Sequence, residues 1–151
     1  MQPDTVTDAS ALVFFLDESI GARLASTALR AAGVTVVMPG EEGSVAPGES
    51  DKTWLAFVGD RGGVYVTGDQ KIKTRALERL AIQQHRVRTF VLVKKDMKGA
   101  QMAACLVAAL PRMVALATVT PGPFIARITP GGGVVMTDWA SLPVPAALRS
   151  L

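Results

Sequence analysis

The sequence predicts an α/β domain, in which a central parallel sheet carries helices on both faces and a hairpin closes the chain. Short apolar runs of four or five residues alternate with longer helical patterns up to about residue 110. Runs this short are strand signals, because a helix needs about ten residues to display its period. Two β-branched runs then flank the glycine-rich segment 129–133. Strict alternation implies right-handed crossovers and a parallel sheet, and the final pair indicates a hairpin at a sheet edge.

The expected elements follow from local signals. The helix over residues 18–32 ends at Gly33, which can adopt a left-handed cap without a Cβ clash. The helix beginning at Asp51 places Trp54 at helical spacing toward the core, and the apolar helix from residue 98 ends before Pro111. The expected elements are strands 12–16, 34–38, 64–67, 89–93, 124–128 and 134–137, and helices 18–32, 51–60, 70–84 and 98–110. The inward stripe of the first helix is expected to be Leu24, Ala28, Leu29 and Ala32.

The helix over residues 70–84 is amphipathic and basic. One face carries Ile72, Ala76, Leu80 and Gln83, and another carries Lys71, Arg75 and Arg79. The segment 71–98 holds nine lysines and arginines against the two acids Glu78 and Asp96. Such clustering favours contact with a polyanion backbone, although a merely solvated helix face has the same composition.

Length and composition favour one cytoplasmic domain. A chain of 151 residues with 49% hydrophobic content can bury one core. We expect a core over residues 11–118 and a hairpin with its tail over 119–151. No apolar run approaches the ~18 residues of a membrane span, and the polar start lacks a signal peptide's order. The single cysteine, Cys105, excludes a disulfide framework and is expected to be buried.

Three aspartates are expected at one edge of the sheet. Asp17 and Asp69 each end a predicted strand, and Asp51 begins a helix that must start at the same edge because the next strand runs parallel to the first. Each could simply cap a helix. Three neighbouring carboxylates repel one another unless a cation lies among them. Oxygen-rich sites of this kind suit Mg²⁺ or Mn²⁺.

At these residues the chain resembles the PIN domains, and among them the VapC-like toxin ribonucleases. The resemblance lies in Phe15-Leu16-Asp17-Glu18, in the helix opened by Asp51, and in Val64-Tyr65-Val66-Thr67-Gly68-Asp69. It implies a three-layer α/β/α, flavodoxin-like fold and metal-dependent endonucleolytic cleavage of RNA, blocked by a cognate antitoxin. The family's usual second acid has no obvious counterpart here; its candidates are Glu18, Glu41, Glu42 and Glu49.

The resulting hypothesis is a Mg²⁺- or Mn²⁺-dependent endoribonuclease toxin. Its catalytic residues are Asp17, Asp51 and Asp69, and its metal ligands are the same three with Glu18. The expected RNA-binding residues are Thr67, Lys71, Lys73, Arg75, Lys94 and Lys95. The expected partners are the RNA and an antitoxin, with the apolar tail over residues 142–148 offering an interface for the antitoxin or for a homodimer.

Two other functions fit part of the pattern. A PIN-like module with an incomplete metal site would bind RNA or a protein without cutting. A phosphorelay receiver also places acids at Asp17-Glu18, a threonine at Thr67 and a lysine at Lys94. The receiver is disfavoured because no aspartate ends the strand at 34–38.

Overall fold

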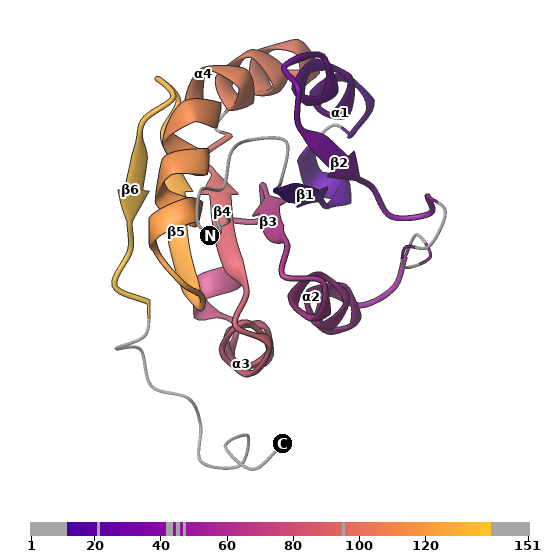
Figure 1. Cartoon of the computed structure of the whole chain (residues 1–151), viewed down its shortest axis with the longest axis vertical. Helices are drawn as coiled ribbons and strands as arrows, with labels where there is room; N and C mark the ends of the chain where they lie inside the picture. The colour runs from indigo at the N-terminus through magenta and orange to yellow at the C-terminus, as the bar shows by residue number, and fades with distance from the viewer. Residues whose placement is uncertain are drawn as a thin grey trace, which may run out of the picture.

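The chain folds around one six-stranded sheet, seen in the computed structural model of Figure 1. The structure describes residues 12–20, 22–41, 44, 46, 48–94 and 96–139, with only the backbone of Ala22, Asp51 and Lys73. The strands are β1 (Val13–Leu16), β2 (Thr35–Val37), β3 (Val64–Thr67), β4 (Arg88–Leu92), β5 (Phe124–Ile128) and β6 (Val134–Met136). The α-helices are α1 (Ala22–Ala31), α2 (Asp51–Asp60), α3 (Ala76–His85) and α4 (Gly99–Val119), and the 3-10 turns are η3 (Glu18–Ile20) and η4 (Ile72–Thr74).

The strand order is β2-β1-β3-β4-β5-β6. The first five strands in this order are parallel, and β6 pairs antiparallel with β5 at the edge. The predicted α/β class and the C-terminal hairpin are therefore confirmed. Only β6 is an edge strand of this hairpin, because β5 pairs in parallel with β4 and so lies inside the sheet.

Two hydrophobic clusters, one on each face of the sheet, make the three layers. Phe14, Val66 and Phe90 belong to the cluster shared with α1 and α4, and Phe15 and Tyr65 to the cluster shared with α2 and α3. This division follows from the strand period of two, which sends successive side chains to opposite faces. Because both faces are covered, the strands are continuous apolar runs, as parallel strands commonly are.

The two acids that follow β1 and β3 lie at neighbouring strand ends. Leu16 pairs with Val66 in the parallel register, and the Asp17 backbone N–H donates to the Val66 carbonyl at 3.1 Å. The pairing therefore places Asp17 next to the C-terminal end of β3, and Asp69 lies two residues after that end. The carboxyl ends of parallel strands are where open α/β sheets bind ligands.

The first helix differs from its prediction. It begins as the separate turn η3, and α1 buries Ala25, Ser26 and Leu29, whereas Leu24 is 53% exposed. Of the predicted stripe, Leu29 alone is fully buried. The buried face therefore includes Ala25 and Ser26 in place of Leu24, and it shares only Leu29 with the predicted stripe. Gly33 adopts φ +98°, as expected of a helix-terminating glycine.

The basic helix begins later than predicted. Residues 72–74 form η4, Arg75 is extended with ψ 116°, and α3 covers only Ala76–His85. The shift rotates the helix relative to the predicted faces, so that Arg79 is buried at 4% exposure rather than displayed. Ile72 is buried as predicted, and Gln83 is exposed. The predicted stripe of three basic residues on the surface of this helix is therefore wrong.

Pro111 lies inside α4 and does not end it. The helix continues to Val119 because Met113 and Ala117, beyond the proline, are buried against the sheet, which offsets the lost backbone hydrogen bond. At 21 residues, with a mean hydropathy of 1.9 over its most apolar 18 residues, α4 is long and apolar enough to cross a membrane, contrary to the expectation from the sequence. All of its buried residues except Ala103 belong to the core cluster that α1 shares, and a core helix meets the same criterion. Cys105 is buried in this helix, as predicted, and burial raises the pKa of its thiol.

Candidate active site

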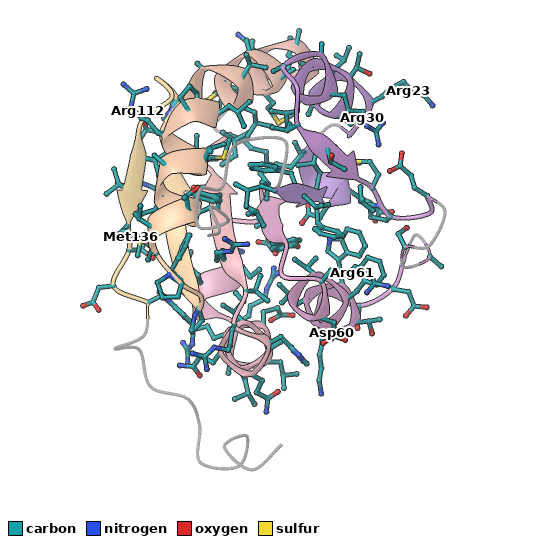
Figure 2. The ribbon with its side chains drawn as sticks, viewed as in Figure 1. Arg23, Arg30, Asp60, Arg61, Arg112 and Met136 are labelled. Carbon is teal, nitrogen blue, oxygen red and sulfur yellow. The ribbon has the colours of Figure 1, made fainter. Side chains whose placement is uncertain are left out.

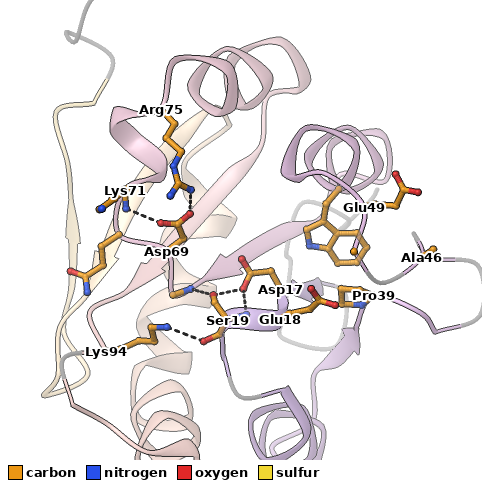
Figure 3. A pocket seen from close by; sticks show the side chains of 14 residues that line it. Asp17, Glu18, Ser19, Pro39, Ala46, Glu49, Asp69, Lys71, Arg75 and Lys94 are labelled. Carbon is orange, nitrogen blue, oxygen red and sulfur yellow. Dashed lines mark hydrogen bonds and ion pairs between the residues drawn. The ribbon is translucent and has the colours of Figure 1, made fainter.

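An open pocket of about 690 Å³ lies at the carboxyl ends of the strands (Figure 3). It combines four acids with three cations. The acids are Asp17, Glu18, Glu49 and Asp69, and the cations are Lys71, Arg75 and Lys94. The remaining lining residues are Ser19, Pro39, Ala46, Gly48, Trp54, Gly68 and Gln70. The pocket therefore joins segments from β1, the β2–α2 loop, β3 and β4 at the edge predicted to hold the site.

Asp17 is held by four hydrogen bonds. Its Oδ1 accepts from the Ser19 backbone N–H at 2.9 Å and from the Ser19 hydroxyl at 2.5 Å. Its Oδ2 accepts from the Tyr65 hydroxyl at 2.9 Å and from the Thr67 hydroxyl at 2.5 Å. A carboxylate offers about four lone-pair positions, so all of them are used. Asp17 is therefore fixed in orientation by β3, and it does more than cap the short turn that follows it.

Asp69 is held differently, by its own loop and by one cation. Its backbone N–H donates to the Thr67 hydroxyl at 3.0 Å, and its Oδ1 accepts from the Lys71 backbone N–H at 3.0 Å. Its Oδ2 forms an ion pair with the Arg75 guanidinium. The two side chains are 25% and 45% exposed, respectively. Figure 3 shows the Asp69 carboxylate turned toward Arg75. Thr67 thus links both acids, through the side chain of Asp17 and the backbone of Asp69.

Lys94 completes the wall from the end of β4. Its Nζ donates to the Ser19 carbonyl at 3.2 Å, and its aliphatic stem lies against Gly68, where a Cβ would approach Lys94 Cδ to 2.7 Å. The Gly68 backbone N–H donates to the Ser19 hydroxyl at 2.8 Å. A glycine at this position therefore lets the lysine cross the tip of β3 and reach the turn after β1.

Comparison with known proteins agrees with this arrangement. A family model described as "PIN like domain" matches residues 12–94. A protein of Mycobacterium tuberculosis named "Putative ribonuclease VapC45" is 32% identical over 132 residues, which cover 86% of this chain and 95% of that protein. This chain is a VapC-like member of the PIN-domain family. No solved structure matches it.

The pocket of this PIN-like chain gathers most, but not all, of the predicted site residues. Thr67 lies fully buried beneath it and bonds to Asp17, while Lys71, Arg75 and Lys94 line it. The backbone of Asp51 begins α2, yet the side chain that caps this helix is Ser50, whose Oγ accepts from the Thr53 N–H at 3.2 Å. The backbone of Lys73 lies in η4, and Lys95 is outside the described residues.

The structure also sorts the four glutamates that were candidates for the second acid. Glu18 and Glu49 line the pocket, and Figure 3 draws the Glu18 carboxylate beside Pro39. Glu41 does not line it, and Glu42 lies outside the described residues. Within the described part of the chain, no three acids, histidines or cysteines are grouped as metal ligands.

Glu41 has a structural role. Both of its oxygens accept from Arg30 Nη2 at 2.9 Å, and Oε1 also accepts from the Met38 backbone N–H at 2.7 Å. The same Arg30 nitrogen donates to the Val36 carbonyl at 2.7 Å. These bonds fasten the end of β2 to α1. The hydrogen bond from Arg30 is the main reason why the pKa of Glu41 lies below its ordinary value.

Replacing Glu41 with Gln should lower stability slightly and in a pH-dependent way. Because its folded pKa is depressed, the carboxylate stabilises the fold above its ordinary pKa of 4.5, and this contribution is lost as the pH falls through the folded pKa. The pair is about 40% exposed, so we expect a loss of only about 0.5 kcal/mol at pH 7. Melting wild type and Glu41→Gln from pH 7 to pH 3 measures this. A difference in melting temperature that widens toward pH 3 would contradict the assignment.

Three residues of the site were not predicted from the sequence. Ser19 contacts Asp17, Gly68 and Lys94, and the Asp-x-Ser spacing that allows its turn was the available signal. Tyr65 was expected only in the core, where it is fully buried, but its hydroxyl reaches Asp17. Trp54 was also assigned to the core and is 4% exposed, yet it lines the pocket, and its buried Nε1 has no hydrogen-bond partner among the described residues.

Proposed function

We propose that this chain is a metal-dependent endoribonuclease and the toxin of a type II toxin–antitoxin module. The observation that carries the proposal is the pocket in which Asp17 and Asp69, from the ends of adjacent parallel strands, meet three cations. Its similarity to a protein named as a ribonuclease of the VapC group supports the same activity. RNA carries one negative charge on each phosphate. The lysines and arginine of the pocket would neutralise phosphates next to the acidic residues.

The donor set suits Mg²⁺ or Mn²⁺. The pocket offers carboxylate oxygens from Asp17, Glu18 and Asp69, without thiolate or imidazole among its described lining. A positive charge already occupies one of these oxygens, because the Arg75 guanidinium pairs with Asp69. We assign Asp17 and Asp69 as the principal ligands, with Glu18 and Asp51 as further ones. Because N–H and hydroxyl donors fill the lone-pair positions of Asp17, a metal ion bound to this carboxylate would displace one of the hydroxyls. A bound divalent ion would supply Lewis acidity for hydrolysis of a phosphodiester.

The protein's own groups orient the acids and hold the substrate. Tyr65 and Thr67 fix the Asp17 carboxylate, so that little reorganisation is required during the reaction. Lys71 and Lys94 place ammonium groups at the pocket wall, where they would bind phosphates next to the cleaved bond. A phosphate or water oxygen in the pocket would also give the Trp54 N–H the acceptor it lacks.

RNA cleavage by the purified wild-type chain should depend on a divalent ion. We expect cleavage of single-stranded RNA with Mg²⁺ or Mn²⁺ and none with EDTA, read out on gels of end-labelled RNA. Ca²⁺ serves as the control for a divalent charge of different size, since it favours a larger and more flexible coordination shell. Equal cleavage in EDTA would contradict metal dependence, and RNA binding without any cleavage would favour the non-catalytic module.

Arg75→Ala should strengthen metal binding. In the present structure Arg75 competes for Asp69, and an exposed ion pair of this kind contributes about 0.2–1 kcal/mol, which corresponds to a gain in Mn²⁺ affinity of about 1.4-fold to fivefold. Titration calorimetry measures this without reference to activity. Arg23→Ala, at an exposed arginine on α1 (Figure 2), removes the same charge away from the pocket. Unchanged or weaker Mn²⁺ binding in Arg75→Ala alone would count against Asp69 as a ligand.

We further propose that the protein acts in the cytoplasm and is neutralised by an antitoxin that covers the acidic edge. An open, charged pocket left free for RNA is a surface that a basic or apolar segment could close. The apolar tail at 142–148, offered above as an interface, lies outside the described residues. Purification from the native host tests the proposal, because a neutralised toxin should co-purify with a partner that blocks RNA cleavage.

A non-catalytic RNA- or protein-binding module is the second candidate. It is favoured by the absence of a three-acid group among the described side chains, which do not include that of Asp51. Metal titration discriminates the two, since the module would bind RNA equally well with and without Mn²⁺ and would show no stoichiometric metal binding.

A further inference from the structure

A second, smaller hollow of about 140 Å³ lies beside the acidic pocket. Its walls come from the loop after β3, the end of β4, and the strands β5 and β6. The lining residues are Gln70, Val91, Val93, Ile125, Arg127 and Thr137. Gln70 lines both hollows and directly follows Asp69 in the chain. A linear ligand that leaves the acidic pocket over Gln70 therefore reaches this hollow next.

The floor of the hollow is apolar, and its rim is polar. Val91 and Ile125 are 7% and 1% exposed, and Val93 is half-buried. Thr137 is fastened to the floor, since its hydroxyl donates to the Ile125 carbonyl at 2.8 Å, which leaves its oxygen free to accept. Gln70 supplies an exposed amide, which can both donate and accept.

Arg127 gives the rim its charge. It is exposed on β5, and within the described residues it forms no ion pair. In the strand alternation it shares a face with Ile125, so it lies on the same side of the sheet as the apolar floor. A guanidinium beside an apolar surface suits a ligand that combines a flat ring with a phosphate.

The volume of the hollow indicates what kind of ring it can hold. A cavity of about 150 Å³ lined by apolar side chains accommodates a benzene molecule. The hollow therefore suits one six-membered ring, whereas the second ring of a purine would project beyond its rim. We propose that it binds one pyrimidine base of the RNA, with the ring on Val91, Val93 and Ile125 and the adjoining phosphate on Arg127. This inference rests on the proposed ribonuclease function and gives it a sequence preference.

Binding of oligouridylate and oligoadenylate of equal length tests the inference. Measured by fluorescence anisotropy in EDTA, where the oligomers stay intact, the wild type should bind oligouridylate on the order of tenfold more tightly than oligoadenylate, the scale of burying one ring against aliphatic side chains. Val93→Phe fills the hollow with a ring and should abolish the preference. Val119→Phe makes the same change at a residue that is 76% exposed at the end of α4, and should leave the preference intact.

If Val93→Phe perturbs the fold, Arg127→Ala tests the same hollow through its charge. Arg127→Ala should weaken binding of both oligomers and lower its salt dependence, whereas Arg112→Ala, an exposed arginine that points outward from α4 in Figure 2, should do neither. Equal affinity of the wild type for the two oligomers would overturn the inference. So would an unchanged preference for oligouridylate in Val93→Phe, since the filled hollow could no longer hold the base. A wild type that cleaves RNA without base preference sinks this inference alone, whereas absence of cleavage sinks the proposed function.

Discussion

Asp69→Asn should abolish RNA cleavage while leaving the fold intact. The change keeps the shape of the side chain and removes the charge that would hold a divalent ion, so we expect a loss of activity on the order of 10²–10³, the scale of removing one electrostatic group from a preorganised site. The asparagine oxygen can still accept from the Lys71 N–H, so the turn after β3 is kept. The cost to stability is limited to the exposed pair with Arg75, at about 0.2–1 kcal/mol.

The measurements are Mn²⁺-dependent cleavage together with thermal melting in EDTA. A loss of 1 kcal/mol corresponds to a drop of about 2–4 °C for a chain of this size. Asp60→Asn makes the same substitution at the exposed C-terminal end of α2 (Figure 2) and should change neither quantity. Full cleavage by Asp69→Asn would remove Asp69 from the catalytic set and leave it as a residue that shapes the turn.

The aspartates at the strand ends were predictable because their positions depend on the strand signal alone. A run of apolar residues precedes Asp17, the last three of them buried, and Val64-Tyr65-Val66-Thr67 leads to Asp69 in the same way. Parallel pairing then brings both to one edge, whatever the details of the helices. The expectation that these acids repel one another in the metal-free protein was incomplete, because the sequence pattern did not assign Arg75 to Asp69.

The errors arose where a helix boundary depended on tertiary contacts. A periodic pattern from residue 70 to residue 84 cannot reveal that η4 and the extended Arg75 interrupt it, and the later start of α3 changes which of its sides faces inward. Arg79 is buried for that reason. Pro111 led to a helix that was predicted too short. The proline removes one helical hydrogen bond wherever it lies, but the sequence does not show that Met113, beyond it, is buried against the sheet. Glu18 and Glu49 could not be separated from Glu41 without knowing that Arg30 holds Glu41.

Asp17→Asn should damage both activity and stability, in contrast to Asp69→Asn. If the asparagine oxygen keeps the bonds from Ser19, its amide group must face the hydroxyls of Tyr65 and Thr67, which both donate to the carboxylate in the wild type. Thr67 could accept from the amide beside the Asp69 N–H, but its own hydroxyl hydrogen would then lose the Asp17 carboxylate as acceptor. Both side chains are fully buried, so the mismatch should cost about 2 kcal/mol, or about 4–8 °C in melting temperature.

Ser19→Ala provides the graded comparison, since it removes one hydroxyl donor from Asp17 but keeps the backbone donor and the charge. Its melting temperature should fall between those of wild type and Asp17→Asn, and its Mn²⁺ affinity should stay measurable by calorimetry while that of Asp17→Asn is lost. An Asp17→Asn variant as stable as wild type would show that the four hydrogen bonds do not hold the carboxylate. A variant that is unstable but binds Mn²⁺ normally would reduce Asp17 to a structural residue and leave Asp69 and Glu18 to hold the ion.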